Sequence, residues 1–322
     1  MNTMKWLLKR EYWEHRGGFF WAPIIGGGIF LLLNLMGIIA GQLAAGRANV
    51  KIGMFKLDSM LNGMDAKAQA MFGSGVDLTM YSTTMFVGVI TGFVLFFYCL
   101  GALYDDRRDR SVLFWKSLPV SDRDTVISKV ITALVVVPLI SLAAGIITAL
   151  LQLAMIGIFF AFHGINAFGA MLSFGHPFRT ILTMFGALPV TMLVALPTIG
   201  WLMLCSAWAK GKPFLWAVGI PIGAGIIVNI MDLMQRLAIP DVSFWRDVVF
   251  RSLFGIFPGA WMDDGFFSQF KDMDDGGQMV VNIVSLDKIY AVLASPTPWI
   301  AAAIGVAMLV VATRLRRWRD EG

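Results

Sequence analysis

The chain has 322 residues, of which 57% are apolar and only 15% are charged. Soluble domains carry about 25% charged residues, so the composition excludes an ordinary soluble globular protein. The net charge is +5, but the basic residues stand in short segments beside apolar runs, which argues against a nucleic-acid-binding protein.

Those apolar runs are long enough to cross a membrane. Runs of about 18 or more residues span a hydrocarbon core of roughly 30 Å, and in lipid a helix satisfies its own backbone hydrogen bonds. The sequence therefore predicts an all-α integral membrane protein with six transmembrane helices. The expected spans are residues 21–45, 82–104, 126–162, 180–208, 214–231 and 297–313.

The first 20 residues precede the first span and differ from it in composition. Residues 3–18 mix apolar and charged side chains at helical spacing. We expect an amphipathic interfacial helix, with Trp6, Leu7 and Trp13 toward lipid and Lys9 and Arg10 toward the headgroups. An ordinary solvated segment beside the membrane is the alternative.

Two features are expected within the spans. The run Gly26–Gly28 lies in the first span and has no Lys-Ser/Thr after it, so close helix packing is its expected use rather than phosphate binding. The third span would be about 55 Å long at 1.5 Å per residue, longer than one bilayer. We expect Pro138 to kink it, or the helix to project past the membrane.

The distribution of Lys and Arg sets the orientation. Segments 1–21, 105–124, 209–213 and 314–322 hold 15 of them in about 55 residues, whereas 46–80, 163–179 and 232–296 hold 10 in about 117 residues. The denser set is expected in the cytoplasm. Both termini are then cytoplasmic, and residues 232–296 form a large external loop between the last two spans.

Catalytic and metal-binding chemistry is sparse in this sequence. By the expected segmentation, no Asp or Glu falls inside a span, which disfavours a membrane-embedded enzyme and an ion-coupled transporter. His15, His163 and His176 are far apart and form no metal-binding motif. No cofactor or metal is expected on this chain.

A few polar or polarisable residues do fall at membrane depth. Cys99 and Cys205 lie inside expected spans, where small packing residues are the simplest interpretation. Asn34, Gln152 and Asn229 either line a substrate path or form hydrogen bonds between helices.

The segment 104–124, YDDRRDRSVLFWKSLPVSDRD, carries more than a topology signal. Acids are interleaved with the bases, and acids contribute little to orientation. Residues 112–115 and Leu118 add apolar bulk, and a short helix that ends before Pro119 would present an aromatic anchor surrounded by charge. This pattern favours a docking site; a solvated loop whose apolar residues rest on the bilayer is the alternative.

The combination resembles the membrane subunit of an ABC-2 type (type V) ABC transporter. The similarity covers the whole chain in layout and rests at the residue level mainly on 104–129. It is carried by the amphipathic stretch MKWLLKREYWEHR, the span ending Leu103-Tyr104-Asp105-Asp106-Arg107, Ser111, the stretch 118–121, the long third span from Lys129 and the large last external loop.

The resemblance implies one permease domain over residues 1–322 that works as an exporter with cytoplasmic ABC ATPase subunits, which bind the ATP and Mg. A second copy or a sister permease completes the membrane unit, located in the bacterial cytoplasmic (inner) membrane, with a substrate route lined by spans 2 and 5. The N-terminal helix would contact the ATPase through Trp6, Lys9, Arg10 and Trp13. The coupling helix in loop 105–124 would dock through Asp106, Arg107, Asp109, Arg110, Ser111, Trp115, Lys116 and Leu118.

The last external loop leaves two questions open. Residues 248–261 are apolar but too short to span, as a re-entrant or interfacial segment would be. The acids Asp263, Asp264, Asp272, Asp274 and Asp275 match no family pattern and form either a solvated surface or a site for a cation or partner. A stand-alone membrane sensor or assembly factor that uses loop 232–296 is therefore the alternative function. The sequence does not identify the transported substrate.

Overall fold

The structure, a computed structural model, describes residues 3–47, 66–108, 121–233, 244–262 and 285–319. Regular structure within these ranges is helical, and no strand occurs in them. Six helical segments among the described residues are long and apolar enough to cross a membrane, which confirms the predicted helical membrane fold at this level. They are Gly17–Arg47, Ala68–Arg108, Asp122–Phe162, Pro177–Trp208, Pro213–Met231 and Pro296–Trp318.

The N-terminal part consists of α1 (Thr3–Glu14), a short π-helix η1 (Gly17–Trp21) and α2 (Ala22–Arg47). Helix α2 packs on α4 and α8 through the glycines that the sequence singled out. A Cβ at Gly26 would collide with Ile90, and one at Gly27 would collide with Thr148. The prediction of close helix packing is therefore confirmed for these two glycines, while Gly28 has open space around it.

Helix α4 (Ala66–Gly101) begins earlier than the expected start of the second span at residue 82. Val76 and Met80, in the part of α4 before residue 82, are buried in a core cluster with residues of α8 (Val137–Phe162), α9 (Ala167–Phe174) and α10 (Pro177–Trp208). Asp77 is also buried there, at 4% exposure, in the part of α4 that precedes the expected second span. The expectation that no acid lies inside a span stays a prediction.

After α4 come α5 (Tyr104–Arg108), α7 (Asp122–Ile131), a π-helix η3 (Thr132–Val136) and α8 (Val137–Phe162). Ser121 caps α7 by accepting a hydrogen bond from the Asp124 amide at 3.1 Å. The π turn lies directly before Pro138, whose missing N–H removes a normal helical hydrogen bond. A π-helical turn therefore precedes Pro138, and the expected kink of this helix stays a prediction.

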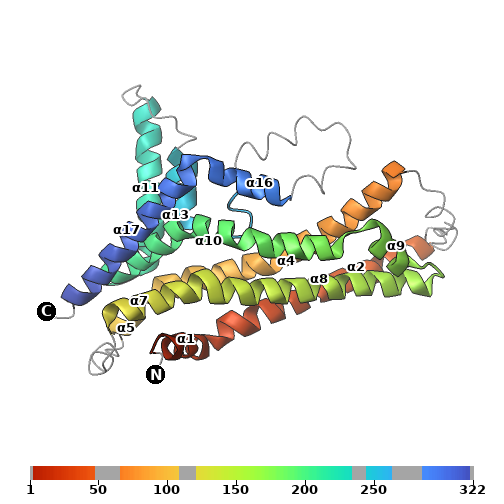
Figure 1. The fold of residues 1–322 in the computed structure, drawn as a ribbon, viewed down its shortest axis with the longest axis horizontal. Helices are drawn as coiled ribbons and strands as arrows, with labels where there is room; N and C mark the ends of the chain where they lie inside the picture. Colours follow the sequence, from red (N-terminus) through yellow and green to blue (C-terminus); the bar gives the residue numbers. More distant parts are fainter. Residues whose placement is uncertain (1–2, 48–65, 109–120, 234–243, 263–284, 320–322) are drawn as a thin grey trace.

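The remaining described helices are α9 (Ala167–Phe174), α10 (Pro177–Trp208), α11 (Pro213–Leu233), α16 (Leu286–Ala291), η5 (Val292–Ala294) and α17 (Pro296–Arg319). Helices α10 and α17 pack closely, because a Cβ at Gly200 would collide with the backbone of Gly305. Helix α11 stands steeply away from α4, α8 and α10 in Figure 1.

The segment 244–262 folds back between α4 and α10. It contains a π-helix η4 (Trp245–Phe250), the short α13 (Arg251–Leu253) and a series of turns. Thr198 of α10 holds it by donating to the Arg251 carbonyl at 2.6 Å and accepting from the Gly255 amide at 2.9 Å. Phe257 then lies against Gly92 of α4. The apolar stretch 248–261 therefore returns to the helix bundle rather than crossing beside it.

The largest core cluster joins α4, α10 and η3. Cys99 and Cys205 are 0% and 1% exposed within it, next to residues such as Leu202 and Val137. Both thiols are free and buried, which confirms their predicted role as packing residues.

Candidate functional site

Charged side chains from four segments meet at the end of the bundle where both chain termini lie, at the lower left of Figure 1. We call Glu11 of α1, Asp106 of α5, Asp122 and Lys129 of α7, and Arg316 of α17 the ion-pair cluster. The Lys129 ammonium lies 3.2 Å from Glu11 and 3.7 Å from Asp106. The Arg316 guanidinium lies 3.0 Å from Asp106 and 3.3 Å from Asp122. These ion pairs therefore connect α1, the first described helix, to α17, the last one.

The centre of the ion-pair cluster is shielded from solvent. The side chains of Glu11, Lys129 and Arg316 are 0%, 3% and 4% exposed. Burying a charge is costly unless it is paired and hydrogen-bonded. Glu11 meets this requirement, because the Tyr98 hydroxyl donates to it at 3.0 Å and Arg10 pairs with it as well.

The protonation of Glu11 follows from these partners. Burial by itself raises the pKa of Glu11, but attraction from Lys129 and Arg10, with hydrogen bonds from Arg10 and Tyr98, outweighs burial and holds the pKa below its ordinary value of 4.5. Glu11 is therefore ionised at neutral pH, which keeps α1 attached to α7 by an ion pair.

The ion-pair cluster holds both ends of the predicted docking segment. Asp106 stands shortly before residues 109–120, and Asp122 begins the helix that follows them. Arg107 adds a third attachment, because its guanidinium donates to the carbonyl of Ser206 and, at 3.1 Å, to that of Ala209. Described residues on either side of 109–120 are therefore joined to α1, α10 and α17 by direct polar contacts.

The predicted docking residues fall into two groups. Asp106 and Arg107 bond within the chain, in the ion-pair cluster and to the end of α10. The other six lie outside the described residues: Asp109, Arg110, Ser111, Trp115, Lys116 and Leu118. The five Asp residues of the external loop, from Asp263 to Asp275, also lie outside them.

Helix α1 presents a mixed face outward. Trp6 and Trp13 are 54% and 61% exposed, and the Lys9 ammonium lies 5.2 Å and 4.5 Å from their ring centroids. The expected orientation is wrong for Leu7, which is buried against the bundle, and Arg10 is directed to Glu11 rather than outward. The Lys9 ammonium is thus grouped with two exposed indoles on the outward face by cation–π attraction.

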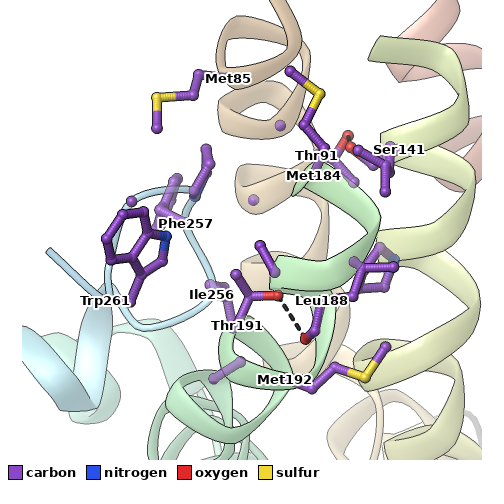
Figure 2. Close-up of a pocket in the computed structure, with 18 of the residues that line it drawn as sticks. Met85, Thr91, Ser141, Met184, Leu188, Thr191, Met192, Ile256, Phe257 and Trp261 are labelled. Atoms are coloured by element: carbon purple, nitrogen blue, oxygen red, sulfur yellow. Dashed lines mark hydrogen bonds between the residues drawn. The ribbon is translucent and has the colours of Figure 1, made fainter. Parts of the chain in front are cut away.

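A cavity of about 180 Å³, the inner cavity, lies between α4, α8, α10 and the turns 255–261. Figure 2 shows Phe257 and Trp261 on one side of it, away from Thr91 and Ser141. The Ser141 hydroxyl donates to the Thr91 hydroxyl at 2.8 Å, which joins α8 to α4. The wall is otherwise largely apolar, with Met and Leu side chains from α10.

A larger groove of about 1210 Å³ lies between α4, α11, segment 244–262 and the start of α17. We call it the aromatic groove. Among the described residues that line it, Arg246 and Arg251 are charged, and Asp247 pairs with both, at 3.2 Å and 3.3 Å. Its rings come from Phe93, Phe96, Phe97, Phe214, Trp245, Phe250, Phe254, Phe257 and Trp261.

The polar residues expected at membrane depth are hydrogen-bonded. The Gln152 amide donates to Asn34 at 3.2 Å, which joins α8 to α2 and supports the interpretation as interhelical hydrogen bonds. Asn229 accepts from the Trp245 indole at 2.8 Å and also lines the aromatic groove. Asn229 therefore fits both interpretations, because it forms a hydrogen bond to another segment and also lines a groove.

Sequence reasoning missed a second polar site, around Asp77. Its carboxylate accepts from the Thr180 hydroxyl at 2.8 Å and from the His176 amide at 3.2 Å, so it caps the start of α10 from a neighbouring helix. No local sequence motif predicts this contact, because Thr180 and His176 are about 100 residues from Asp77 in the chain. Within the described ranges, no set of three or more His, Cys, Asp or Glu side chains could hold a metal ion.

No family model matches this chain, and comparison with curated proteins and with solved structures finds no match either.

Proposed function

We propose that this chain is the membrane-spanning permease subunit of an ATP-driven ABC transporter of the ABC-2 type, coupled to a separate cytoplasmic ATPase and acting in export. The supporting observation is the ion-pair cluster, which ties both ends of segment 109–120 to α1 and α17. A permease driven by another subunit needs such a surface segment, joined firmly to several spans. The proposed location is the bacterial cytoplasmic membrane, with both termini inside.

In this proposal the ATPase transmits its closure through the coupling helix, about 109–118. Movement there reaches α5 and α7, which Lys129 joins through Asp106. Helix α7 continues without a break through η3 into α8, over a 41-residue segment. Helices α4 and α8 also line the inner cavity, so a displaced coupling helix would change the walls of the membrane interior.

The second proposed contact with the ATPase is the outward face of α1. Trp6, Lys9 and Trp13 are grouped there and carry the large exposed aromatic surface of that helix. Tryptophan is among the residue types enriched at the centres of protein interfaces. A second copy of the chain, or a sister permease, completes the membrane unit, and ATP and Mg bind to the ATPase.

Co-purification tests the proposal directly. The chain is expressed with the ATPase encoded nearest to it, extracted in mild detergent and compared with a variant carrying Arg110→Glu and Trp115→Ala. A matched variant, Arg179→Glu with Trp299→Ala, makes the same chemical changes at exposed positions on the expected external side. We expect the ATPase to remain with wild type and the matched variant and to be lost from the docking variant.

Two outcomes of the co-purification experiment would contradict the proposed docking site. An ATPase that never co-purifies, or that stays with both variants equally, rejects segment 109–120 as the docking site. The sensor or assembly-factor function of loop 232–296 then becomes the leading hypothesis. Where docking holds, Trp115→Ala alone is expected to separate ATP hydrolysis from transport in reconstituted vesicles.

A further inference from the structure

We infer that the aromatic groove binds one anionic amphiphile taken from the bilayer, with its acyl chain along the rings and its headgroup at Arg246 and Arg251. This inference deepens the proposed function, on which it rests for the claim that the bound molecule is the transported class. The binding itself requires no ATPase, so it can be tested separately.

The groove has the length of an acyl chain. It follows α11 from Phe214 to Asn229, about 22 Å at a rise of 1.5 Å per residue. That distance exceeds half the thickness of a hydrocarbon core of roughly 30 Å. Rings line it throughout: the Phe97 and Phe214 centroids lie 6.3 Å apart, and those of Phe93 and Phe257 lie 5.0 Å apart.

The two ends of the groove differ in polarity. Asn229 and Trp245 are hydrogen-bonded to each other at one end of α11, and Arg246 follows directly in the chain. Phe214 stands at the other end of α11, against Phe96 and other rings. A ligand that fits this gradient has one polar end and one long apolar end.

The charge at the polar end selects an anionic headgroup. Arg246 and Arg251 line the groove, and the carboxylate of Asp247 pairs with both, so these three described residues together carry one net positive charge. Arginine stays charged over the whole accessible pH range, and its planar fork suits phosphate and carboxylate oxygens. Arg246 is 41% exposed at its side chain, so a headgroup can reach it from solvent.

A helix from a second copy of the chain fits the groove less well. A helix crossing lipid would place an apolar surface against Arg246 and Arg251, which line the groove. The acyl chain of a lipid avoids this conflict, because it ends in its own polar group.

The test measures lipid binding to the purified chain in mild detergent by native mass spectrometry. The probes are phosphatidylglycerol and phosphatidylcholine with identical acyl chains, titrated separately. We expect phosphatidylglycerol to bind more tightly by on the order of tenfold, as one charge-assisted contact provides. Equal affinities for the two lipids would overturn the inference.

Charge variants locate the headgroup. Arg246→Gln with Arg251→Gln is expected to remove the preference for phosphatidylglycerol, while Arg123→Gln with Arg179→Gln, which makes the same change at exposed sites away from the groove, keeps it. Preference that survives in the groove variant, or falls equally in both, overturns the assignment of the headgroup to this end.

A steric variant keeps the inference testable even where the charge variant folds poorly. Ile222→Trp fills the groove, whereas Ile227→Trp places the same ring on an exposed part of α11 that does not line it. We expect the tight lipid to be lost only from Ile222→Trp. If Ile222→Trp instead converts a dimer to a monomer and leaves lipid binding unchanged, a second copy occupies the groove and the inference is wrong. Neither readout depends on ATP hydrolysis or transport, so the proposed function can fail independently.

Discussion

Lys129 is the cation at the centre of the ion-pair cluster, and Lys129→Met removes its charge while it keeps a long apolar side chain. Two contacts are lost, at 3.2 Å to Glu11 and 3.7 Å to Asp106. Removing one partner from a buried ion pair costs about 3–5 kcal/mol. Glu11 retains Arg10 and Asp106 retains Arg316, so we expect a loss of about 3 kcal/mol, at the lower end of that range.

The assay is thermal unfolding in detergent, followed by the fraction of chain that stays monodisperse after heating. For large domains each kcal/mol shifts Tm by about 2–4 °C, so Lys129→Met is expected to lower Tm by roughly 6–12 °C. The control is Lys210→Met, which makes the same change at an exposed lysine and should shift Tm by little, since surface substitutions stay within about 0.5 kcal/mol. Equal Tm values for the two variants would refute the structural role of the cluster.

Two further predictions concern pH and packing. Because the pKa of folded Glu11 lies below 4.5, its stabilisation is present above pH 4.5 and is lost as pH falls through the lower folded-state pKa. Tm measured from pH 7 to pH 3 should therefore fall more for wild type than for Glu11→Gln; parallel curves contradict this. A Cβ at Gly92 would lie 2.7 Å from Phe257, so Gly92→Val should displace turns 254–262 and speed their amide hydrogen exchange, whereas Gly28→Val, with open space around Gly28, should leave that exchange unchanged.

The helical membrane fold could be predicted because lipid imposes a simple rule on sequence. A span needs a long apolar run, and that signal is local, so six candidate spans were readable from the distribution of apolar residues along the chain. The start of α4 was not readable in the same way. Ser74 and Asp77 look like loop residues, yet both are buried in the helix at 3% and 4% exposure. The Asp77 carboxylate is stabilised there by Thr180 and His176, which only the folded chain brings near.

The ion-pair cluster shows the same limit more strongly. The sequence contains all five charged residues of the cluster, and the sequence resemblance assigns Asp106 to the docking site. The ion pair between Asp106 and Arg316 joins positions about 200 residues apart, for which no spacing rule exists. In the sequence, these opposite charges are equally compatible with exposed residues in solvated loops. The burial of Glu11, Lys129 and Arg316 distinguishes a buried ion-pair cluster from such loops.

The aromatic groove was hidden for a different reason. The rings of the second and fifth spans are the residues that any lipid-facing helix carries, so composition does not separate a groove wall from a bilayer surface. The groove forms because segment 244–262 turns back to α10, where Thr198 holds it. The short apolar run 248–261 is recognisable in the sequence. The sequence does not show that this run packs against α10.

The contact between Gly200 and Gly305 has a consequence for biosynthesis. At about 5–20 residues per second, a ribosome needs on the order of 5–20 s to make the roughly 100 residues between them. Helix α10 therefore enters the membrane several seconds before α17, which covers its glycine face. During that interval another helix or a lipid must occupy this face, and it must leave readily. The order of synthesis thus favours a weak, exchangeable early neighbour for α10 over a tight one.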